Sequence, residues 1–173
     1  MIVLIIDSSV LIDLIHAGID GEALAAWRME APELLVLTEL EEYADRVVRS
    51  GLVITPLTAV EEQLTSALFS RYGHAQDASK RQQKKALSRN DCSVLALAKL
   101  RERVMLVGDK GLRDAAAEHD VEAHGVLWLL DQMDQHQVLS RARLMAALER
   151  MATRPRKRLP AEDVQLLRTR WES

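Results

Sequence analysis

The feature that most constrains the fold is an uninterrupted apolar run at the start of the sequence. Met1 to Ile6 reads MIVLII, and the run ends at Asp7. A run so rich in Ile and Val is typical of a strand buried on both faces, as in a parallel sheet. From Ser8 to Ala17 the apolar residues recur at helical spacing, and Gly18 follows. The sequence therefore predicts a central strand that carries Asp7 to the edge where open α/β sheets bind ligands.

Asp7 has two interpretations on this stretch alone. A carboxylate directly before a helix often accepts a backbone N–H of the first turn and acts as a cap. The same position at the end of a central strand suits a group that binds or reacts with a ligand. Both interpretations stay open until the other acidic residues are placed.

Strand-like and helix-like segments alternate along the chain, which predicts a parallel sheet with helices on both faces. Further strands are expected at 33–38, 52–57, 104–107 and 121–123, with 52–57 at an edge because it contains Pro56. Helices are expected at 21–29, 39–49, 59–72, 91–100, 112–118, 126–133, 140–151 and 160–171. We divide the chain into a main domain, 1–137, and a helical appendage, 138–173, which contains the basic linker 153–159.

Cysteine content and hydropathy bear on the cellular compartment. The single cysteine, Cys92, excludes a disulfide framework and a zinc cluster, and is typical of a reducing cytoplasm. No apolar run approaches the ~18 residues of a membrane span, and Met1 leads into a strand without a signal peptide. The sequence therefore predicts a cytoplasmic protein without membrane association.

Charge is distributed unevenly along the chain. Residues 1–77 contain 13 Asp and Glu against 4 Lys and Arg, whereas residues 78–173 contain 13 against 19. This asymmetry indicates an acidic site beside a basic surface. The basic stretch His74–Arg89 is either a solvated surface or a contact for nucleic-acid phosphates. Aromatic residues are scarce, and we interpret Trp128 as a core residue, so charge and metal rather than base stacking would hold a nucleic acid.

Acidic residues recur where predicted strands end or helices begin. Asp7 follows the first strand, Asp109 follows the strand 104–107, and Asp91 opens a helix. Carboxylates gathered at one sheet edge raise each other's pKa unless a cation neutralises them. Oxygen ligands favour hard divalent cations, so the sequence predicts Mg²⁺ or Mn²⁺ at this edge.

Four segments together resemble the motifs of PIN-domain nucleases of the VapC-like toxin type. They are IIDSSVLIDL (Ile5–Leu14), ELEEYADRV (Glu39–Val47), SRNDCSVLALA (Ser88–Ala98) and LVGDKGLRD (Leu106–Asp114). The resemblance covers roughly residues 1–130. It implies a three-layer α/β/α PIN-like fold with a central parallel sheet of four to five strands.

The resemblance also implies a set of site residues. The catalytic acids would be Asp7, Glu42, Asp91 and Asp109, with Asp7, Asp91 and Asp109 as ligands of Mg²⁺ or Mn²⁺. Glu42 is preferred over Glu39 because it directly precedes Tyr43 on the apolar face, as the family's acid precedes an apolar residue. The expected substrate-binding residues are Ser9, Arg113, Lys84 and Lys85.

The activity implied by the resemblance is hydrolysis of RNA phosphodiester bonds by a metal-dependent endoribonuclease. Attack by metal-activated water would leave a 3′-hydroxyl and a 5′-phosphate. The protein would be the toxin of a toxin–antitoxin pair, inhibited by an antitoxin protein, and a homodimer. The alternative is a catalytically weak PIN-fold module that binds RNA or a protein. A phosphotransferase of the haloacid-dehalogenase type is disfavoured because it needs a second Asp where this chain has Ser9.

Overall fold

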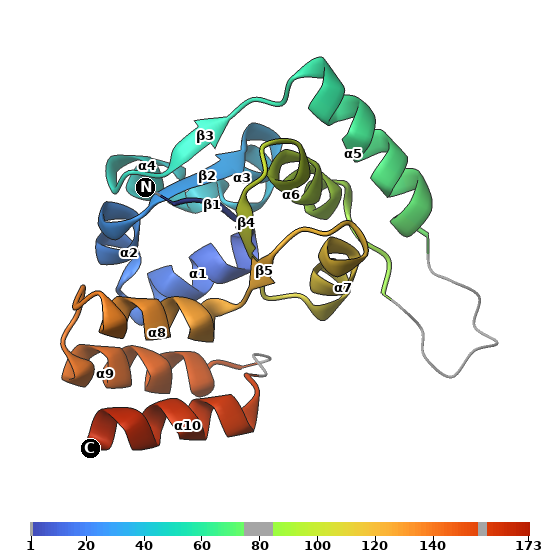
Figure 1. Ribbon diagram of the computed structural model, residues 1–173. Coiled ribbons are helices and arrows are strands. Elements are labelled where there is room, and N and C mark those ends of the chain that lie inside the picture. Colours follow the sequence, from blue (N-terminus) through green and yellow to red (C-terminus); the bar gives the residue numbers. More distant parts are fainter. Residues whose placement is uncertain (1, 75–84, 156–158) are drawn as a thin grey trace.

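The protein is built on a five-stranded sheet in which every strand pair is parallel (Figure 1). The computed structural model describes residues 2–74, 85–155 and 159–173. The spatial order of the strands is β3-β2-β1-β4-β5. Their bounds are β1 (Val3–Ile6), β2 (Arg28–Pro32), β3 (Val53–Thr55), β4 (Val104–Leu106) and β5 (Ala123–His124).

Helices cover both faces of this sheet. Right-handed crossovers place the helices that join β1, β2 and β3 on one face and those that join β3, β4 and β5 on the other. The helices are α1 (Ser8–Ala17), α2 (Asp20–Ala26), α3 (Glu33–Glu39), α4 (Ala44–Arg49), α5 (Ala59–Tyr72), α6 (Arg89–Leu100), α7 (Lys110–Glu118), α8 (Val126–Gln135), α9 (Arg141–Ala152) and α10 (Ala161–Glu172). The predicted layering of helices on both faces of a parallel sheet is therefore confirmed.

The strand order places a topological switch point between β1 and β4. The chain leaves β1 toward β2 on one side and leaves β4 toward β5 on the other. Ile6 and Leu106 are register partners, and the Asp7 N–H donates to the Leu106 carbonyl at 3.0 Å. The carboxyl ends of these two strands therefore lie together, in the position where open α/β sheets bind their ligands.

The second strand lies earlier in the chain than expected, and this is a correction. The segment 33–38, predicted as a strand, is part of helix α3, while β2 occupies Arg28–Pro32, where the helix 21–29 was expected to end. A short apolar run does not by itself distinguish a strand from a buried helix turn. The strand β2 was not recognised in the sequence because it contains Glu30 and Pro32, which are both buried.

The helix predicted at 39–49 is interrupted. A 3-10 turn, η1 (Glu41–Tyr43), separates α3 from α4, and Leu40 between them is not helical (φ −123°, ψ 14°). Leu40 is fully buried, so its side chain anchors the break in the core. Glu39 therefore ends α3, while Glu42 lies in the 3-10 turn beyond the break.

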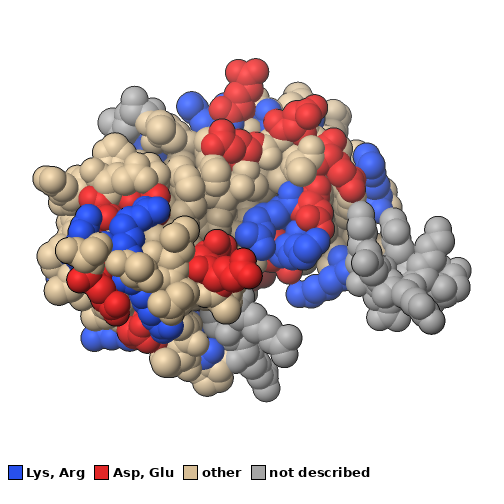
Figure 2. Space-filling model, turned by 60° about the horizontal axis from the view of Figure 1, so that its bottom comes forward, with Lys and Arg blue, Asp and Glu red and all other residues tan. Residues whose placement is uncertain are grey.

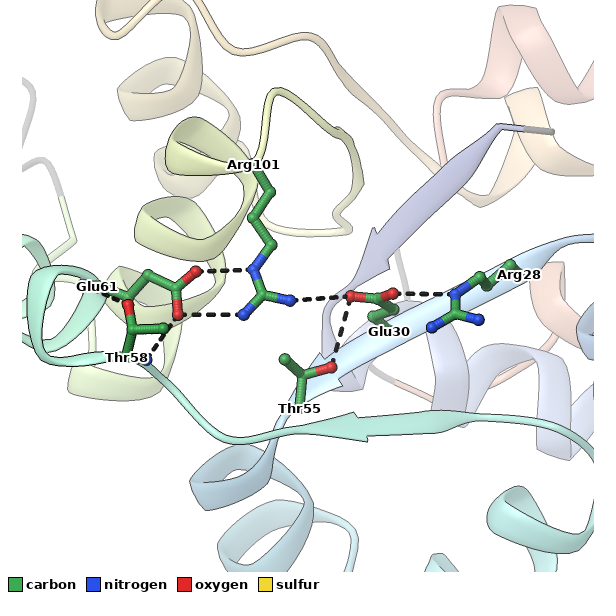
Figure 3. A network of polar contacts seen from close by, with 6 residues as sticks. All are labelled: Arg28, Glu30, Thr55, Thr58, Glu61 and Arg101. Carbon is green, nitrogen blue, oxygen red and sulfur yellow. Dashed lines mark hydrogen bonds and ion pairs between the residues drawn. The ribbon is translucent and has the colours of Figure 1, made fainter.

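A network of ion pairs around the buried carboxylates Glu30 and Glu61 joins α5 and α6 to the strands β2 and β3 (Figure 3). The Arg101 guanidinium, just after α6, contacts Glu61 of α5 at 2.7 Å and Glu30 of β2 at 3.6 Å. Thr55 of β3 also donates to Glu30, at 3.4 Å. Buried carboxylates require such partners, because an unpaired buried charge is strongly destabilising.

The last two helices pack on the rest of the protein. Figure 1 shows α8, α9 and α10 stacked in succession beside α1. Arg150 and Arg154 fix α9 to α1 by bonding the Ala17 carbonyl at 3.1 Å and the buried Asp13 carboxylate at 2.8 Å. The expected boundary at 137/138 falls in the connection between α8 and α9. In the described part of the chain, no helix is long and apolar enough to cross a membrane.

Candidate active site

Asp7 lies at the carboxyl end of β1 and is almost completely buried, with 4% of its surface exposed. It occupies the N-cap position of α1, yet its side chain makes no capping hydrogen bond to that helix. Instead the Ser9 hydroxyl donates to Asp7 Oδ2 at 2.7 Å. Ser9 in turn accepts the Gly108 N–H at 3.3 Å, which links the ends of β1 and β4. The capping interpretation therefore does not account for the Asp7 carboxylate.

The electrostatic surroundings of Asp7 favour its neutral form. The pKa of Asp7 is raised from 3.8 to about 6, and burial is the largest cause. The carboxylates of Asp91 and Glu39 contribute to this rise, while hydrogen bonds from the Ser9 hydroxyl and the Ser8 backbone act against it. The main electrostatic influences on Asp7 are thus burial and neighbouring acids, not a Lys or Arg of the described chain.

Asp91 reaches the site through a helix start that the sequence defines locally. Ser88 caps α6 by accepting the Asp91 N–H at 3.0 Å, and Asp91 Oδ2 accepts the Ser88 N–H at 2.8 Å. This reciprocal capping box holds Asp91 in the first turn of α6. Asp91 Oδ1 makes no hydrogen bond within the described chain, so one oxygen stays available for a ligand.

A hydrogen bond that the sequence did not reveal joins the segments of Glu39 and Asp91. Asn90 Nδ2 donates to the Thr38 hydroxyl at 2.8 Å, while that hydroxyl donates to the Leu34 carbonyl at 2.7 Å. Because the hydroxyl proton is already used, Thr38 acts as the acceptor toward Asn90. Thr38 precedes Glu39 and Asn90 precedes Asp91, so this bond sets the spacing between the two acids.

Glu39 lies close enough to Asp7 to act on its carboxylate, because its charge is among those that raise the pKa of Asp7. The side chains of Glu39 and Glu42 are both exposed, but the break at Leu40 separates their backbone positions. Glu42 was preferred for its position before Tyr43 on the apolar face of a helix expected over 39–49, and the structure interrupts that helix at Leu40.

Asp109 follows β4 and caps α7, whose Leu112 N–H it accepts at 3.0 Å. It is half-buried, and its neighbour Gly108 contacts Ser9. The structure therefore places Asp109 at the same sheet edge as Asp7.

The donor set fits a hard divalent cation in chemistry, although it is not gathered into a chelating cluster. All the acids at this edge offer oxygen, and the main influences on Asp7 are burial and neighbouring acids. Among the described residues, no three His, Cys, Asp or Glu side chains are close enough to hold a metal together. Mg²⁺ sites commonly use one or two carboxylates, with waters and substrate phosphates completing the octahedron. Asp7 and Asp91 fit that kind of site.

The expected substrate-binding residues have different surroundings. The Ser9 hydroxyl donates to the Asp7 carboxylate and accepts the Gly108 N–H. Arg113 of α7 is half-buried and has no ion pair with the described residues. Lys85 is exposed and lines a cavity of about 140 Å³ beside the start of α7. Lys84 lies outside the described residues, as does most of the basic stretch 74–89.

Many of the described basic side chains in the second half of the chain form ion pairs within the fold. Arginines of α9 and α10 form ion pairs with acids, among them Arg143 with Glu22 and Arg168 with Glu149. On the face shown in Figure 2, the described Lys and Arg side chains lie interspersed with Asp and Glu. The uneven charge along the sequence does not become one broad basic field on this face.

Cys92, next to Asp91, is buried in the core, and burial raises the pKa of its thiol to about 11. A thiol with such a pKa is a poor nucleophile near neutrality, since the thiolate is the reactive form. Cys92 therefore acts as a small buried hydrophobe in this position. The Cys92 thiol is therefore not suited to act as a nucleophile at the start of α6.

The chain matches the model of a known protein family. The family model DUF3368, a PIN domain, matches residues 3–173. Among solved structures, the chain is similar to a PilT N-terminus domain protein from the hyperthermophilic archaeon Sulfolobus solfataricus P2. That likeness has 12% sequence identity and a TM-score of 0.49, and covers 76% of this chain and 92% of that chain. No curated protein matches the chain.

PIN domains are typically nucleases and generally use divalent metal ions. The predicted PIN-like α/β fold, with its parallel sheet, is confirmed. Because the match extends over nearly the whole chain, the protein belongs to the PIN-domain family DUF3368.

Proposed function

We propose that the protein is a metal-dependent endoribonuclease whose centre is Asp7. The observation that carries this proposal is the buried Asp7 carboxylate, whose pKa is raised by burial and by Asp91 and Glu39. A fold gains nothing from a buried acid beside other acids, so its retention at a switch point favours a catalytic use. A divalent cation bound there would stabilise the ionised acid, polarise a phosphodiester and lower the pKa of a coordinated water.

The roles of the acids follow from their positions. We assign Asp7, Asp91 and Asp109 as the metal ligands, with Asp7 and Asp91 as the inner pair. Glu39 replaces Glu42 as the fourth acid, because Glu39 acts on Asp7. Ser9 orients the Asp7 carboxylate through its 2.7 Å hydrogen bond, and is a positioning residue rather than a substrate contact.

The phosphates of a bound strand would be held by cations around the acidic edge. Arg113 follows Asp109 by one turn and has no competing ion pair in the described chain. Lys85 is exposed beside the start of α7. Lys84, which is outside the described residues, stays a proposed contact from the sequence alone. Since dispersed cations favour a flexible strand over a rigid duplex face, single-stranded RNA is the proposed substrate.

The experiment that tests the activity compares matched glutamate substitutions. Purified protein is incubated with a single-stranded RNA labelled at its 5′ end and with Mg²⁺ or Mn²⁺. Cleavage should require the metal and stop with EDTA, and the products should carry a 3′-hydroxyl and a 5′-phosphate. Glu39→Gln should lower kcat at least tenfold, whereas Glu42→Gln should leave it within twofold. Absence of metal-dependent cleavage by the wild type would contradict the proposal.

We further propose that the protein is a toxin with a cognate antitoxin protein, and that it acts as a cytoplasmic homodimer. This rests on the resemblance of the four acidic segments to VapC-like toxins. Inducible expression of the wild type should arrest growth, and Asp91→Ala should relieve the arrest at equal protein level. Growth that is unaffected by the wild type would contradict the toxin assignment, without bearing on cleavage in vitro.

A second candidate function is a catalytically weak PIN-fold module that binds RNA or a protein. The observation that favours it is the lack of a preassembled cluster of three metal-binding groups among the described residues. Asp91 and Asp109 also serve as helix caps, a role that needs no reaction. Such a module should bind RNA equally well after Asp7→Asn and should show no metal-dependent cleavage before or after the change.

A further inference from the structure

A cavity of about 220 Å³ lies at the carboxyl ends of β4 and β5, next to the acidic edge. Three segments that are distant in the sequence form its walls: the start of α7, the start of α8 and the start of α10. Its lining includes Gly108, Arg113, Gly125, Trp128, Pro160 and Asp163.

The cavity is connected to the acidic site through one residue. Gly108 lines the cavity, and its N–H donates to Ser9, which donates to Asp7. A molecule in the cavity is therefore adjacent to anything bound at Asp7. For a strand of RNA that is cleaved at Asp7, this is the place of a neighbouring nucleotide.

An oriented aromatic pair contributes to the cavity. The half-buried ring of Trp128 stacks on His124, with ring centroids 4.2 Å apart and ring planes 8° from parallel. His124 is in turn held by Glu122, whose Oε1 lies 2.7 Å from the His124 Nε2. The indole thus has a fixed orientation in the wall, which differs from the core position expected for Trp128. Stacking on aromatic side chains is the usual way to hold a base of a single strand.

Charged groups in the same walls limit the class of ligand that the cavity can bind. The Arg113 guanidinium packs on Gly125, with Nη1 3.6 Å from the position that a Cβ there would take. Arg113 and Asp163 both line the cavity, and neither makes an ion pair with the described residues. A carboxylate in the wall disfavours a free phosphate, but accepts hydrogen bonds from a base or a ribose hydroxyl. An aromatic ring, a guanidinium and a carboxylate in one cavity suit the base, the phosphate and the ribose of one nucleotide.

We propose that this cavity binds the nucleotide next to the cleaved phosphodiester, with Trp128 stacked on its base and Arg113 paired with its phosphate. The proposal rests on the proposed nuclease function and adds a subsite to it. The subsite sets how the strand is positioned, since the stacked base fixes which phosphate reaches Asp7.

The test uses two pairs of matched substitutions. Trp128→Leu is compared with Trp27→Leu, because Trp27 also contacts a histidine, His136, but lies just before β2 at the opposite edge of the sheet. Arg113→Gln is compared with Arg103→Gln, an exposed arginine that precedes β4 at that opposite edge. Trp128→Phe keeps an aromatic face and serves as the conservative variant.

Binding is measured with a short single-stranded RNA in EDTA, by anisotropy and by tryptophan fluorescence. Trp128→Leu should raise Kd and KM about 5- to 100-fold, with kcat within twofold, and Trp128→Phe should recover most of the affinity. RNA should quench the fluorescence of the wild type and of Trp27→Leu, but not that of Trp128→Leu. Arg113→Gln should lower the salt slope of log K by about 0.7, while Arg103→Gln leaves it unchanged.

The two proposals fail in different ways. Wild-type protein that binds RNA with quenching but does not cleave it overturns the nuclease function and supports the subsite. Wild-type protein that cleaves RNA while Trp128→Leu and Arg113→Gln leave Kd, KM and salt slope unchanged overturns the subsite alone. Wild-type protein that neither binds the RNA in EDTA nor cleaves it with Mg²⁺ or Mn²⁺ overturns both. Circular dichroism and thermal unfolding verify that each variant is folded. If Trp128→Leu does not fold, the result for Arg113→Gln decides whether the subsite exists.

Discussion

The Asp7 carboxylate is held where water hardly reaches it, by the backbone of β1 and by the Ser9 hydroxyl. Its neighbours Asp91 and Glu39 carry the same sign of charge. In the absence of a cation, ionising Asp7 in the folded state costs free energy that the unfolded chain does not bear. The residue therefore weakens the fold at the place where a bound cation would be most stabilising.

The substitution Asp7→Asn should separate stability from activity. Asn has nearly the same shape and no charge, so at pH 7.5 and without metal the free energy of unfolding should rise by about 1–3 kcal/mol. RNA cleavage should fall to background. Urea denaturation measures the first and the RNA assay the second. Added Mn²⁺ should raise the Tm of the wild type only; a metal-induced shift that persists in the variant would contradict the assignment of Asp7 as a ligand.

The Asn90–Thr38 hydrogen bond should affect catalysis more than stability. It lies at the surface, so its net stabilisation is about 0.5–1.5 kcal/mol, but it joins the segments that carry Glu39 and Asp91. Asn90→Ala should lower kcat several-fold with KM little changed. Thr38→Val should do the same, and the double variant should be no worse than either single one. Additive losses in kcat would show that the bond does not position the acids.

At the scale of elements, polar groups decide how the helices are joined to the sheet. Helices α5 and α6 each begin with a reciprocal capping box, at Thr58 and at Ser88. Helix α5 is further held by Glu61, which bonds Arg101 with both oxygens, at 2.7 and 3.3 Å. Arg101 also reaches Glu30, so one guanidinium serves two nearly buried carboxylates (Figure 3). These contacts hold α6, and with it Asp91, against the sheet.

Arg101 and burial have opposite effects on Glu61, and the ion pair prevails, so the pKa of Glu61 is lowered. A lowered pKa in the folded state means that Glu61 stabilises the fold above its ordinary pKa of 4.5 and less as the pH falls below it. Glu61→Gln should therefore destabilise the protein at pH 7, by about 1–3 kcal/mol. The difference from wild type should shrink below pH 4.5 in urea denaturation.

Glu62 provides the matched control for Glu61 on the same turn of α5. Its ion pair with Arg89, at 3.2 Å, lies at the surface, and both side chains are about half exposed. Glu62→Gln should change stability by less than about 1 kcal/mol at any pH. Equal effects of the two substitutions would mean that burial of the Glu61 pair is irrelevant to its contribution.

At the scale of the whole molecule, the hydrophobic core is continuous from the sheet to the C-terminus. Buried residues of α9 and α10, such as Leu148 and Trp171, belong to the same cluster as Leu14 of α1. Arg154 reaches the buried Asp13 of α1 from just beyond α9. The last two helices are therefore expected to unfold together with the sheet, in one transition.

Trp171 tests this continuity in the last helix. The ring is 7% exposed, so Trp171→Ala should lower the free energy of unfolding by about 3–5 kcal/mol in a single transition. Its Nε1 is buried without a hydrogen-bond partner within the described chain. Trp171→Phe removes that unsatisfied donor along with some volume, so its effect should stay within about 1 kcal/mol. A separate early transition in Trp171→Ala would contradict the single core.

Local patterns in the sequence were sufficient to predict those elements whose bounds depend on residues close together in the chain. Helix α1 follows from the spacing of its apolar residues and from Gly18, whose φ of 72° suits glycine. Helix α5 has the predicted bounds, 59–72, because Thr58 and Glu61 cap it locally. The strand β2 was missed because Glu30 is buried only with the help of Arg101, a residue 71 positions away.

The candidate site shows the same division. Asp7, Asp91 and Asp109 could be proposed as site residues from the sequence because each lies at the end of a strand or the start of a helix, which local patterns define. Glu39 could be preferred over Glu42 only once the structure showed the break at Leu40. The cavity beside Trp128 could not be predicted because three segments distant in the sequence form it.

The sequence by itself determined that a buried parallel strand ends in an acid, that further acids follow on other elements, and that the chain resembles PIN-domain nucleases. Only the tertiary structure decided which acids act on Asp7 and which aromatic and cationic side chains lie beside it. The physical reason is the distance along the chain between the residues that interact. Periodicity and capping depend on residues a few positions apart, whereas the pKa of a buried carboxylate depends on charges brought close by packing.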